Sequence, residues 1–455
     1  MHTRPYRHRK VLSYRTILPL VLGFLLAGSA WPTAAEPASK DRRGEAQHVV
    51  LVVWDGMRPD FVTEANAPNL ARLAKRGVTF SKHHSIYPSL TNVNAVALAT
   101  GMNPNRSGMI ANWTFDPKLG GAKLTRTDAP EIIAKGDQLS SGKYLNAPTI
   151  AELVRASGRR TAIAGTKTAA FLHDRNLAAA KSPAGRSTML HSGDTVPSDL
   201  TRELVELLGP FPEEPASPNV AQDLWTTRAL TEVLWKDGVP TFSVLWLSDP
   251  DRSQHSTSPG TEAALGGIKS SDENLGRLIR ALEEKGVLDK TDILLASDHG
   301  FSTIARSVNV PDFLRERGFE VADEDDLSLA RGQIRVAGNG GTNFYYVGER
   351  DATTVRRLVE TLQQADFAAV IFSRDGVEGT FPISEARIDT DAGPDVVMSF
   401  RWTADRNADG VSGMIFANGS SGKDKGTHGT LSPFDLHNTF IAAGPDFRSG
   451  VVTTG

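Results

Sequence analysis

Short runs of apolar residues alternate along this chain with longer stretches in which apolar residues recur at helical intervals. The apolar runs, rich in branched and aromatic side chains, lie at residues 48–54, 241–247 and 292–296. Such runs are typical of strands buried on both faces of a parallel sheet. Helical spacing is found at residues 68–76, 92–99, 219–235 and 262–285. The alternation predicts an α/β fold with a mostly parallel central sheet and helices on both of its faces.

The pattern changes between residues 308 and 402, where short apolar runs and one helical stretch at 353–362 are separated by glycine and aspartate. We interpret this part as an inserted, smaller α+β subdomain. A final apolar run at 440–443 returns to the earlier pattern. The predicted core therefore consists of residues 36–307 and 403–455, and the predicted subdomain of residues 308–402.

The first 35 residues have the composition of a targeting segment. Basic residues precede an apolar run at 17–30, and Thr33-Ala34-Ala35 supplies the small residues that a signal peptidase prefers. We therefore predict a signal peptide at residues 1–35 and export to the periplasm or out of the cell. The apolar run of about 14 residues is short for a membrane span. An uncleaved N-terminal anchor is the alternative that this segment leaves open.

The charge balance and the absence of cysteine exclude several classes of function. The 455 residues include 50 basic and 53 acidic ones, giving a formal net charge of −3. This balance argues against a surface that binds nucleic acid by neutralising phosphates. Cysteine is absent, which excludes disulfide bonds, thiolate metal sites and a cysteine nucleophile. No later segment is apolar over the length of a membrane span, so we expect no membrane contact beyond an uncleaved anchor.

Aspartates lie just beyond the ends of the three most apolar predicted strands. Asp55 follows the first strand, Asp251 lies shortly past the second, and Asp298 lies just past the third. Ligands of an open α/β sheet bind beyond the carboxyl ends of its strands, so we expect these three carboxylates to lie close together. A single aspartate at such a place is more often a helix cap or a turn residue. Three at equivalent strand ends indicate a ligand site instead.

Three histidines accompany these aspartates. His255 and His299 follow two of them in sequence, and His428 lies in a loop between glycines. Three carboxylates and three imidazoles suit a divalent ion such as zinc, with manganese or iron as alternatives. Six protein ligands exceed the number that one tetrahedral catalytic ion uses when it keeps an open position. We therefore predict a pair of divalent ions.

A hydroxyl group next to these ligands is a candidate nucleophile. The segment Tyr87-Pro-Ser-Leu-Thr-Asn-Val-Asn carries hydroxyls, those of Ser89 and Thr91, at the start of a predicted helix. One reading is that Ser89 or Thr91 simply caps this helix. The other is that metal coordination lowers the pKa of a hydroxyl and makes it a nucleophile. Phosphoryl transfer needs that chemistry, because two ions can hold the attacking and leaving oxygens in line.

Five motifs resemble, in their order along the chain, those of the alkaline phosphatase superfamily. They are Val-Trp-Asp55-Gly, Thr91-Asn-Val-Asn, Asp251-x-x-x-His255, Ser-Asp298-His299-Gly and Gly-Thr-His428-Gly. They are most similar to its branch of type I phosphodiesterases and nucleotide pyrophosphatases, and the resemblance covers most of residues 48–445. It implies an alkaline-phosphatase-like fold. It also implies a two-metal hydrolase that cleaves phosphodiester or pyrophosphate bonds of a small substrate through a phosphothreonine intermediate.

The resemblance further implies a role for each matching residue. Thr91 would be the nucleophile, and Asn112 would bind a non-bridging phosphoryl oxygen of the substrate. One zinc ion would be held by Asp251, His255 and His428, and the other by Asp55, Asp298, His299 and Thr91.

Departures from the family pattern keep other functions open. Asn92 stands where nucleotide-acting members often carry a phenylalanine that stacks on the base. The run from Thr91 also resembles phosphonoacetate hydrolase, which breaks a carbon–phosphorus bond and holds the substrate carboxylate with lysines. Lys167 matches one such substrate-binding lysine, but Ala169 stands where the second is expected. A phosphonate hydrolase, a phosphomonoesterase and a non-catalytic protein that binds phosphate or phosphonate are thus the alternatives.

Overall fold

The computed structural model describes residues 44–121, 123–175, 186–213, 215–323, 326, 328–419 and 422–454. The predicted signal peptide at residues 1–35 lies outside the described residues. From Gly44 onward the chain forms one compact unit. Within the described part of the chain, no helix combines the length and the apolarity that crossing a membrane requires.

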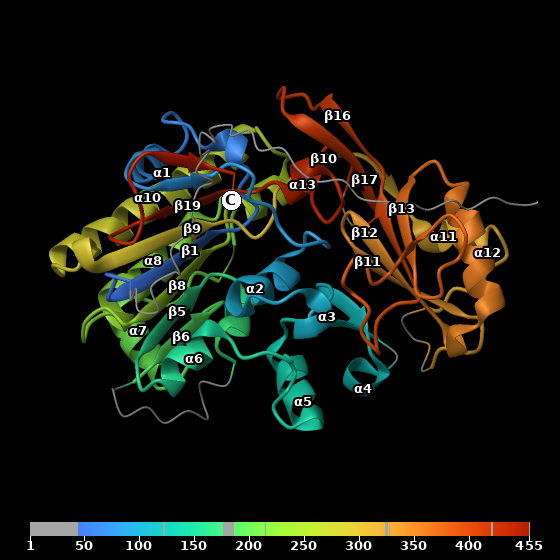
Figure 1. Ribbon diagram of the computed structural model, residues 1–455, viewed down its shortest axis with the longest axis horizontal. Coiled ribbons are helices and arrows are strands. Elements are labelled where there is room, and N and C mark those ends of the chain that lie inside the picture. Colours follow the sequence, from blue (N-terminus) through green and yellow to red (C-terminus); the bar gives the residue numbers. More distant parts are fainter. Residues whose placement is uncertain are drawn as a thin grey trace, which may run out of the picture. The chain divides into compact units, whose positions relative to one another are not determined.

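A nine-stranded sheet forms the larger part of this unit, in the order β20-β2-β19-β9-β1-β8-β5-β6-β7 (Figure 1). Parallel pairing joins β1 (His48–Trp54), β8 (Phe242–Leu247), β9 (Thr291–Ala296), β5 (Thr161–Gly165) and β6 (Thr188–His191). Toward the edges, β7 (Asp194–Val196) pairs antiparallel with β6, and β19 (Phe440–Ala443) pairs antiparallel with β9 and with β2 (Val78–Phe80). The outermost strand β20 (Val451–Thr453) is parallel to β2. The predicted, mostly parallel central sheet is confirmed.

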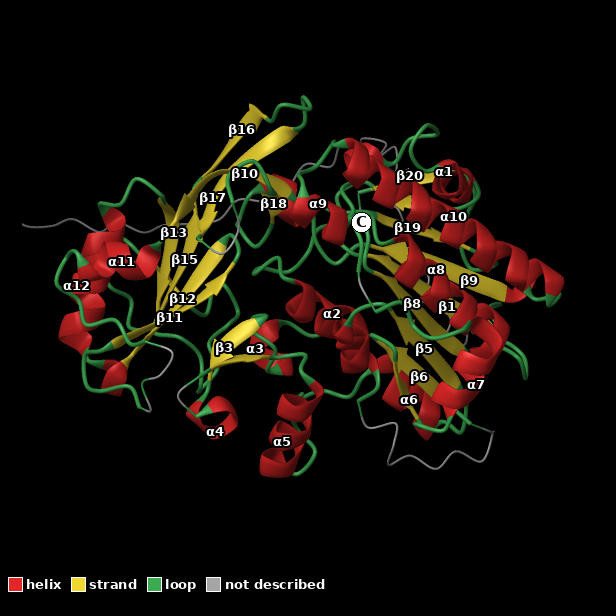
Figure 2. Cartoon of the chain, turned by 180° about the vertical axis from the view of Figure 1, so that it is seen from behind, coloured by secondary structure: helices red, strands yellow, loops and turns green. Residues whose placement is uncertain are grey.

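Strand β1 is apolar from Val49 to Trp54 because helices cover both faces of the sheet, as the opposite views of Figures 1 and 2 show. Val50, Val52 and Trp54 share a core with α1 (Pro68–Lys75), α7 (Leu200–Leu208), α8 (Val220–Arg228) and α10 (Glu262–Glu284). Leu51 and Val53 share the opposite core with α2 (Thr91–Thr100) and α6 (Ile150–Ala156). Each fully buried side chain of this size contributes about 1.5–3 kcal/mol.

The helix predicted at residues 219–235 changes its geometry near the middle. Helix α8 ends at Arg228, and Ala229–Leu234 continue the chain as a π-helical turn. The wider turn keeps Leu230, Val233 and Leu234 within the core of this face. The stretch is therefore helical throughout, as expected, but not as one α-helix.

Two smaller sheets lie in the predicted subdomain and at its borders. The five-stranded sheet consists of β11 (Ile334–Asn339), β12 (Thr342–Val347), β15 (Val396–Phe400), β13 (Ala368–Ser373) and β14 (Phe381–Pro382). With α11 (Val310–Arg315) and α12 (Ala352–Gln363) it encloses a core of its own. The four-stranded sheet consists of β16 (Trp402–Arg406), β17 (Ser412–Asn418), β10 (Ser302–Val308) and β18 (Gly426–Thr427).

Short elements complete the described chain. After α2 come α3 (Pro104–Ser107), β3 (Trp113–Phe115), α4 (Pro117–Gly120), β4 (Leu124–Arg126) and α5 (Pro130–Ser140). Helices α9 (Asp251–Ser256) and α13 (Pro433–Leu436) follow β8 and β18 along the chain. Single 3₁₀ segments occupy Pro59–Phe61, Thr168–His173, Leu288–Lys290 and Gly348–Arg350.

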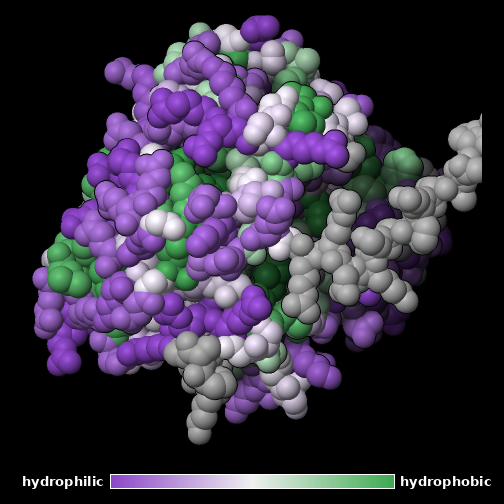
Figure 3. Space-filling view, turned by 60° about the vertical axis from the view of Figure 1, so that its left-hand side comes forward, coloured by the Kyte–Doolittle hydropathy of each residue, from purple (hydrophilic) through white to green (hydrophobic). Residues whose placement is uncertain are grey.

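The surface drawn in Figure 3 is mostly hydrophilic, with apolar side chains in scattered groups. Among the large apolar side chains that are exposed are Trp113, Leu139, Leu153 and Leu207. Isolated apolar side chains are normal on the surface of a folded protein and indicate no function by themselves.

Candidate active site

The three predicted aspartates converge at the carboxyl ends of β1, β8 and β9. Asp55 follows β1 directly, and Asp251 is the first residue of α9, which begins shortly after β8. The backbone N–H of Asp251 donates to the carbonyl of Asp55 at 2.9 Å, and the N–H of Gly56 donates to Asp298 Oδ1 at 3.1 Å. These bonds tie the three loops together, so adjacent parallel strands place the aspartates side by side as expected.

Each of these carboxylates keeps one buried oxygen without a hydrogen-bond partner among the described residues. The atoms are Asp55 Oδ1, Asp251 Oδ1 and Asp298 Oδ2. A buried carboxylate oxygen without a hydrogen bond is costly, because it has lost its water. A cation bound between these oxygens would remove that cost.

The three predicted histidines share one orientation. In each, ring Nδ1 lies within hydrogen-bond distance of a backbone carbonyl oxygen. His255 Nδ1 lies 3.0 Å from the carbonyl of Gly426, and His299 Nδ1 lies 2.9 Å from that of Gly300. His428 Nδ1 lies 2.7 Å from the carbonyl of Ser89. A hydrogen on Nδ1 that donates to the carbonyl leaves Nε2 with its lone pair, which is the form that binds a metal.

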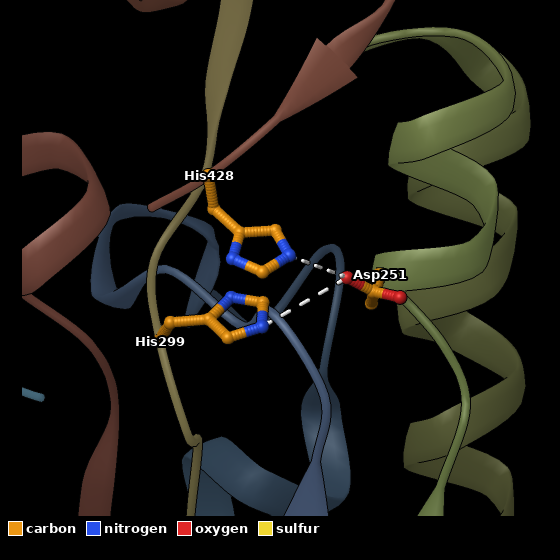
Figure 4. Close-up of side chains that lie close together, drawn as sticks. All are labelled: Asp251, His299 and His428. Carbon is orange, nitrogen blue, oxygen red and sulfur yellow. Dashed lines mark ion pairs between the residues drawn. The ribbon is translucent and has the colours of Figure 1, made fainter. Parts of the chain in front are cut away.

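The Nε2 atoms point at the aspartates. His255 Nε2 and His428 Nε2 lie 3.2 and 3.6 Å from Asp251 Oδ1. His299 Nε2 lies 3.4 Å from Asp55 Oδ1 and 3.2 Å from Asp298 Oδ2. The rings of His299 and His428 stack with their centroids 3.5 Å apart, and both face Asp251 (Figure 4).

Two compact groups of ligand atoms result, one of Asp55, Asp298 and His299, the other of Asp251, His299 and His428. The first corresponds to the protein carboxylates and imidazole predicted for one ion. In the second, His299 joins Asp251 and His428, while His255 contacts Asp251 from beside the group. His299 thus faces both groups, which the order of residues in the sequence does not reveal.

Charge at this centre is unbalanced toward the negative. Burial, and then the charge of Asp55, raise the pKa of Asp298 to about 7. Burial alone would lower the pKa of His299, but the carboxylates of Asp298 and Asp55 raise it to about 9. Burial and the neighbouring His299 hold the pKa of His428 well below its usual value. A donor set of carboxylates and imidazoles with excess negative charge fits divalent ions such as zinc.

Thr91 is the first residue of α2 and lies at the same centre. Its side chain is buried, and Oγ1 lies 3.2 Å from His299 Nε2. Neither of the two hydroxyls considered as caps acts as one: the N-cap of α2 is Leu90, and Ser89 Oγ donates instead to the carbonyl of Thr430 at 3.0 Å. The capping interpretation of this segment is therefore wrong, which leaves the Thr91 hydroxyl available for chemistry.

Asn112 lies in the loop before β3 and is tied to the residue after Thr91. Its Oδ1 accepts a hydrogen bond from the backbone N–H of Asn92 at 2.9 Å. The side chain of Asn92 is buried, and its Nδ2 donates to Thr127 Oγ1 at 3.0 Å. Asn92 therefore offers no surface for a substrate base and instead helps to hold the Asn112 loop beside Thr91.

Lys167, expected to contact the substrate, lies against two of the aspartates. Its Nζ is 2.7 Å from Asp251 Oδ2 and 2.8 Å from Asp55 Oδ2. Burial alone would lower the pKa of Lys167, but the carboxylates of Asp251 and Asp55 raise it, so the ammonium stays protonated. Ala169, where a second lysine was considered, is buried. The described site thus gains one positive charge from this segment.

Two further residues support the site and were not found from the sequence. Trp246 Nε1, on β8, donates to Asp55 Oδ2 at 3.0 Å. Asp435 Oδ2, in α13, accepts from the backbone N–H of Thr430 at 2.9 Å and so holds the loop that carries His428. The contact of Trp246 with Asp55 could have been predicted only from the register of β1 with β8, which sets Val53 beside Trp246.

Comparisons of the sequence with known families and curated proteins agree with the resemblance seen in the motifs. A family model described as type I phosphodiesterase / nucleotide pyrophosphatase matches residues 49–429. The bis(5'-adenosyl)-triphosphatase enpp4 of Xenopus laevis is 22% identical over 62% of this chain and 53% of its own length. A venom phosphodiesterase of Naja atra is 21% identical over 92% of this chain and 44% of its own. The chain thus spans about half the length of these curated relatives.

Solved structures with the same fold include two kinds of enzyme. Murine ectonucleotide pyrophosphatase / phosphodiesterase 5, in complex with AMP, superposes with a TM-score of 0.61 at 17% identity, covering 90% of each chain. Phosphonoacetate hydrolase from Sinorhizobium meliloti, in complex with phosphonoacetate, gives a TM-score of 0.58 at 18% identity, covering 88% of this chain and 90% of the other. At such identities the likeness establishes the alkaline-phosphatase-like fold.

Proposed function

The chain belongs to the type I phosphodiesterase / nucleotide pyrophosphatase family, and from this premise we propose that it is an exported two-metal phosphohydrolase. It cleaves phosphodiester or pyrophosphate bonds of a small substrate through a phosphothreonine on Thr91. One observation carries the proposal: at the ends of β1, β8 and β9, three carboxylate oxygens without hydrogen bonds face the Nε2 atoms of three imidazoles, and the Thr91 hydroxyl lies beside one of these imidazoles.

The proposed ligands divide between two ions. Asp55, Asp298, His299 and Thr91 would hold one ion, and Asp251, His255 and His428 the other. Zinc suits this mixture of carboxylates and imidazoles best, with manganese or iron as alternatives. When bound, such ions lower the pKa of a coordinated hydroxyl and neutralise the charge that develops on the transferring phosphoryl group.

The residues of the chain divide the reaction into two displacements. Thr91 Oγ1 gives up its proton to solvent and attacks phosphorus, the bond from phosphorus to the leaving oxygen breaks, the leaving group takes up a proton, and the rest of the substrate stays on Thr91 as a phosphothreonine ester. Water then attacks phosphorus, the bond to Oγ1 breaks, Oγ1 regains a proton, and a phosphate monoester leaves. Asn112 has its Oδ1 committed to Asn92 N–H, so its Nδ2 is the group that donates to a non-bridging phosphoryl oxygen and steadies the charge on it.

The positive charge of Lys167 beside the site supports a second candidate function. A diester has one negative charge at its phosphoryl group, whereas a monoester or a phosphonoacetate has a further one. The ammonium beside Asp55 and Asp251 is the kind of group that would bind this extra charge. The second candidate is therefore a phosphomonoesterase or a carbon–phosphorus hydrolase similar to phosphonoacetate hydrolase. Ala169 offers no second amine, which is why we rank this candidate below the diesterase.

Rates on three substrates test the proposal. The purified chain is assayed with bis(p-nitrophenyl) phosphate, p-nitrophenyl phosphate and phosphonoacetate, each with a chelator and again after zinc is restored. We expect the diester to be hydrolysed fastest, the chelator to abolish the activity and zinc to recover it. A dominant rate on the monoester or on phosphonoacetate would favour the second candidate. Metal-dependent binding of phosphate without hydrolysis of any substrate would instead indicate a binding protein.

A further inference from the structure

A buried asparagine of the predicted subdomain contacts the loop that carries Asn112. Asn339 is the last residue of β11, and its side chain is almost completely buried. Its Oδ1 accepts from the backbone N–H of Trp113 at 2.9 Å, and its Nδ2 donates to the carbonyl of Trp113 at 3.0 Å. One side-chain amide thus pairs with both backbone groups of the residue that follows Asn112, as a neighbouring strand would.

Nothing in the Trp113 side chain explains why its backbone is held in this way. The indole is 40% exposed, so burial of the side chain is not what fixes the loop. On the other side of Asn112, the carbonyl of Asn112 accepts from the backbone N–H of Thr127 at 3.0 Å. Hydrogen bonds therefore fix the backbone at Asn112 in two ways. Thr127 bonds to Asn112 itself, and Asn339 bonds to the next residue, Trp113.

The residues after Asn339 contact two more parts of the site. The backbone N–H of Gly341 donates to the carbonyl of His428 at 2.7 Å. Thr342 Oγ1 lies 2.9 Å from the hydroxyl of Tyr87, in the segment that leads to Thr91. There is no room for a side chain at this place, since a Cβ on Gly340 would lie 2.6 Å from the His428 carbonyl oxygen. The turn between β11 and β12 therefore touches the loops of Asn112, His428 and Thr91 at once.

From these contacts we propose that Asn339 is a positioning residue for phosphoryl transfer, which acts by fixing the backbone of Asn112. The proposal rests on the proposed function, because it assumes that the Asn112 amide donates to the substrate. A hydrogen-bond donor to a phosphoryl oxygen must be positioned accurately, because displacing it by about 1 Å can lower the rate by about 100-fold. Asn112 lies on a loop, so its accuracy depends on the contacts that hold its neighbours.

Two substitutions of Asn339 separate positioning from simple loss of contacts. Asn339→Ala removes both hydrogen bonds to Trp113, whereas N339D keeps the acceptor for the Trp113 N–H and sets a carboxylate oxygen against the Trp113 carbonyl in place of the donor. We expect kcat on bis(p-nitrophenyl) phosphate to fall by about 10- to 100-fold in both variants. The metal content and the KM should change little, because the Asn339 side chain bonds to the backbone of Trp113 and Ala337 rather than to the side chains of the proposed metal ligands.

A double-mutant cycle with Asn112→Ala supplies the decisive readout. If Asn339 acts through Asn112, adding Asn339→Ala to Asn112→Ala should lower kcat/KM by less than about twofold further, since residues that act as a unit are non-additive. Full additivity in the double variant would overturn the positioning role, as would unchanged kcat in both single Asn339 variants. If Asn339→Ala fails to fold, N339D completes the same cycle.

Asn407 provides the matched control. It also lies at a hairpin turn, between β16 and β17, where its Oδ1 accepts from the backbone N–H of Val411 at 2.9 Å and its Nδ2 donates to the carbonyl of Pro259 at 2.7 Å. Asn407→Ala should lower stability but leave kcat unchanged. An equal loss of kcat in Asn407→Ala would mean that any weakened turn slows the enzyme, and would overturn the specific role of Asn339.

The same measurements distinguish a failure of the positioning role of Asn339 from a failure of the proposed function. No hydrolysis by the unaltered chain would overturn the function itself, and the positioning role with it. An unaltered chain that hydrolyses the diester and an Asn112→Ala variant that loses rate would support the function. Additive losses in the double variant would then overturn the role of Asn339 alone.

Discussion

The Thr91 hydroxyl is the most informative single group to remove, because it caps no helix and contacts His299. Thr91→Ala leaves all carboxylates and imidazoles of the site in place. We expect turnover of bis(p-nitrophenyl) phosphate to fall by about 1000-fold or more, with metal content near two ions per chain. Initial rates and elemental analysis measure both. Thr100→Ala, at the other end of α2, is the matched control, and full activity in Thr91→Ala would exclude Thr91 as nucleophile.

The Lys167 ammonium offsets the negative charge of two aspartates when no ion is bound. Its removal should therefore make the stability of the fold depend on bound metal. In Lys167→Met, the carboxylates of Asp55 and Asp251 lose their partner. Breaking a buried ion pair in this way costs about 3 kcal/mol or more. We expect the free energy of unfolding to fall by about that amount in the presence of a chelator, and the deficit to shrink when zinc is bound. Urea unfolding with and without zinc measures this.

The control for Lys167 is the exposed Lys143. Lys143→Met should change the free energy of unfolding little under either condition. An equal loss of stability in Lys167→Met with and without zinc would show that Lys167 supports the fold rather than the charge balance of the site.

Asp292, at the opposite end of β9 from Asp298, predicts a dependence of stability on pH. Burial raises the pKa of Asp292 to about 6. A carboxyl whose pKa is raised by folding holds its proton more tightly in the folded state, so stability falls as pH rises from about 4 to about 6. Asp292→Asn should remove this component and gain on the order of 1 kcal/mol at pH 7, with no gain at pH 4. Unfolding curves across this pH range measure it.

At the scale of elements, α6 shows how local chemistry starts a helix at a defined residue. Thr149 Oγ1 accepts from the backbone N–H of Glu152, whose carboxylate accepts from the N–H of Thr149. Such a reciprocal cap contributes about 1 kcal/mol. Thr149→Ala should lower the free energy of unfolding by that amount and leave kcat unchanged, because the cap lies outside the site. A loss of activity without loss of stability would contradict this.

Elements whose evidence is local could be predicted from the sequence. The period of apolar residues identified β1, β8 and β9, because a strand covered on both faces must be apolar at every position. Their parallel pairing then placed Asp55, Asp251 and Asp298 at one edge, as the rule for strand ends requires. The central sheet and the convergence of the three aspartates thus followed from patterns within single segments.

Contacts between loops that are distant in sequence could not be predicted in this way. The sequence does not reveal that the Lys167 ammonium lies on two aspartates, because only the packing of β5 beside β8 brings them together. The pairing of Asn339 with Trp113 joins residues on two different sheets. The interpretation of Ser89 or Thr91 as a cap was wrong because helix-start statistics cannot distinguish a cap from a hydroxyl drawn toward other loops.

At the scale of the molecule, the site collects side chains from separate parts of the folded unit. The strand ends of the large sheet supply Asp55, Asp251 and Asp298, whereas His428 lies on the loop after β18, against the turn of the predicted subdomain. Proposed ligands from both parts therefore lie close together. Two bound ions would therefore act as cross-links of the folded unit as well as groups for catalysis.

Removal of the metal ions should consequently destabilise the whole unit. A ligand that binds only the folded state stabilises it by about 2.7 kcal/mol when its free concentration is 100 times its dissociation constant. With two ions, we expect a chelator to lower the thermal midpoint by about 5 °C or more. In Asp298→Asn, which loses a carboxylate of one proposed ion, the chelator should have a smaller effect. Scanning calorimetry with zinc and with chelator measures both, and equal midpoints despite demonstrated zinc binding would exclude a cross-linking role.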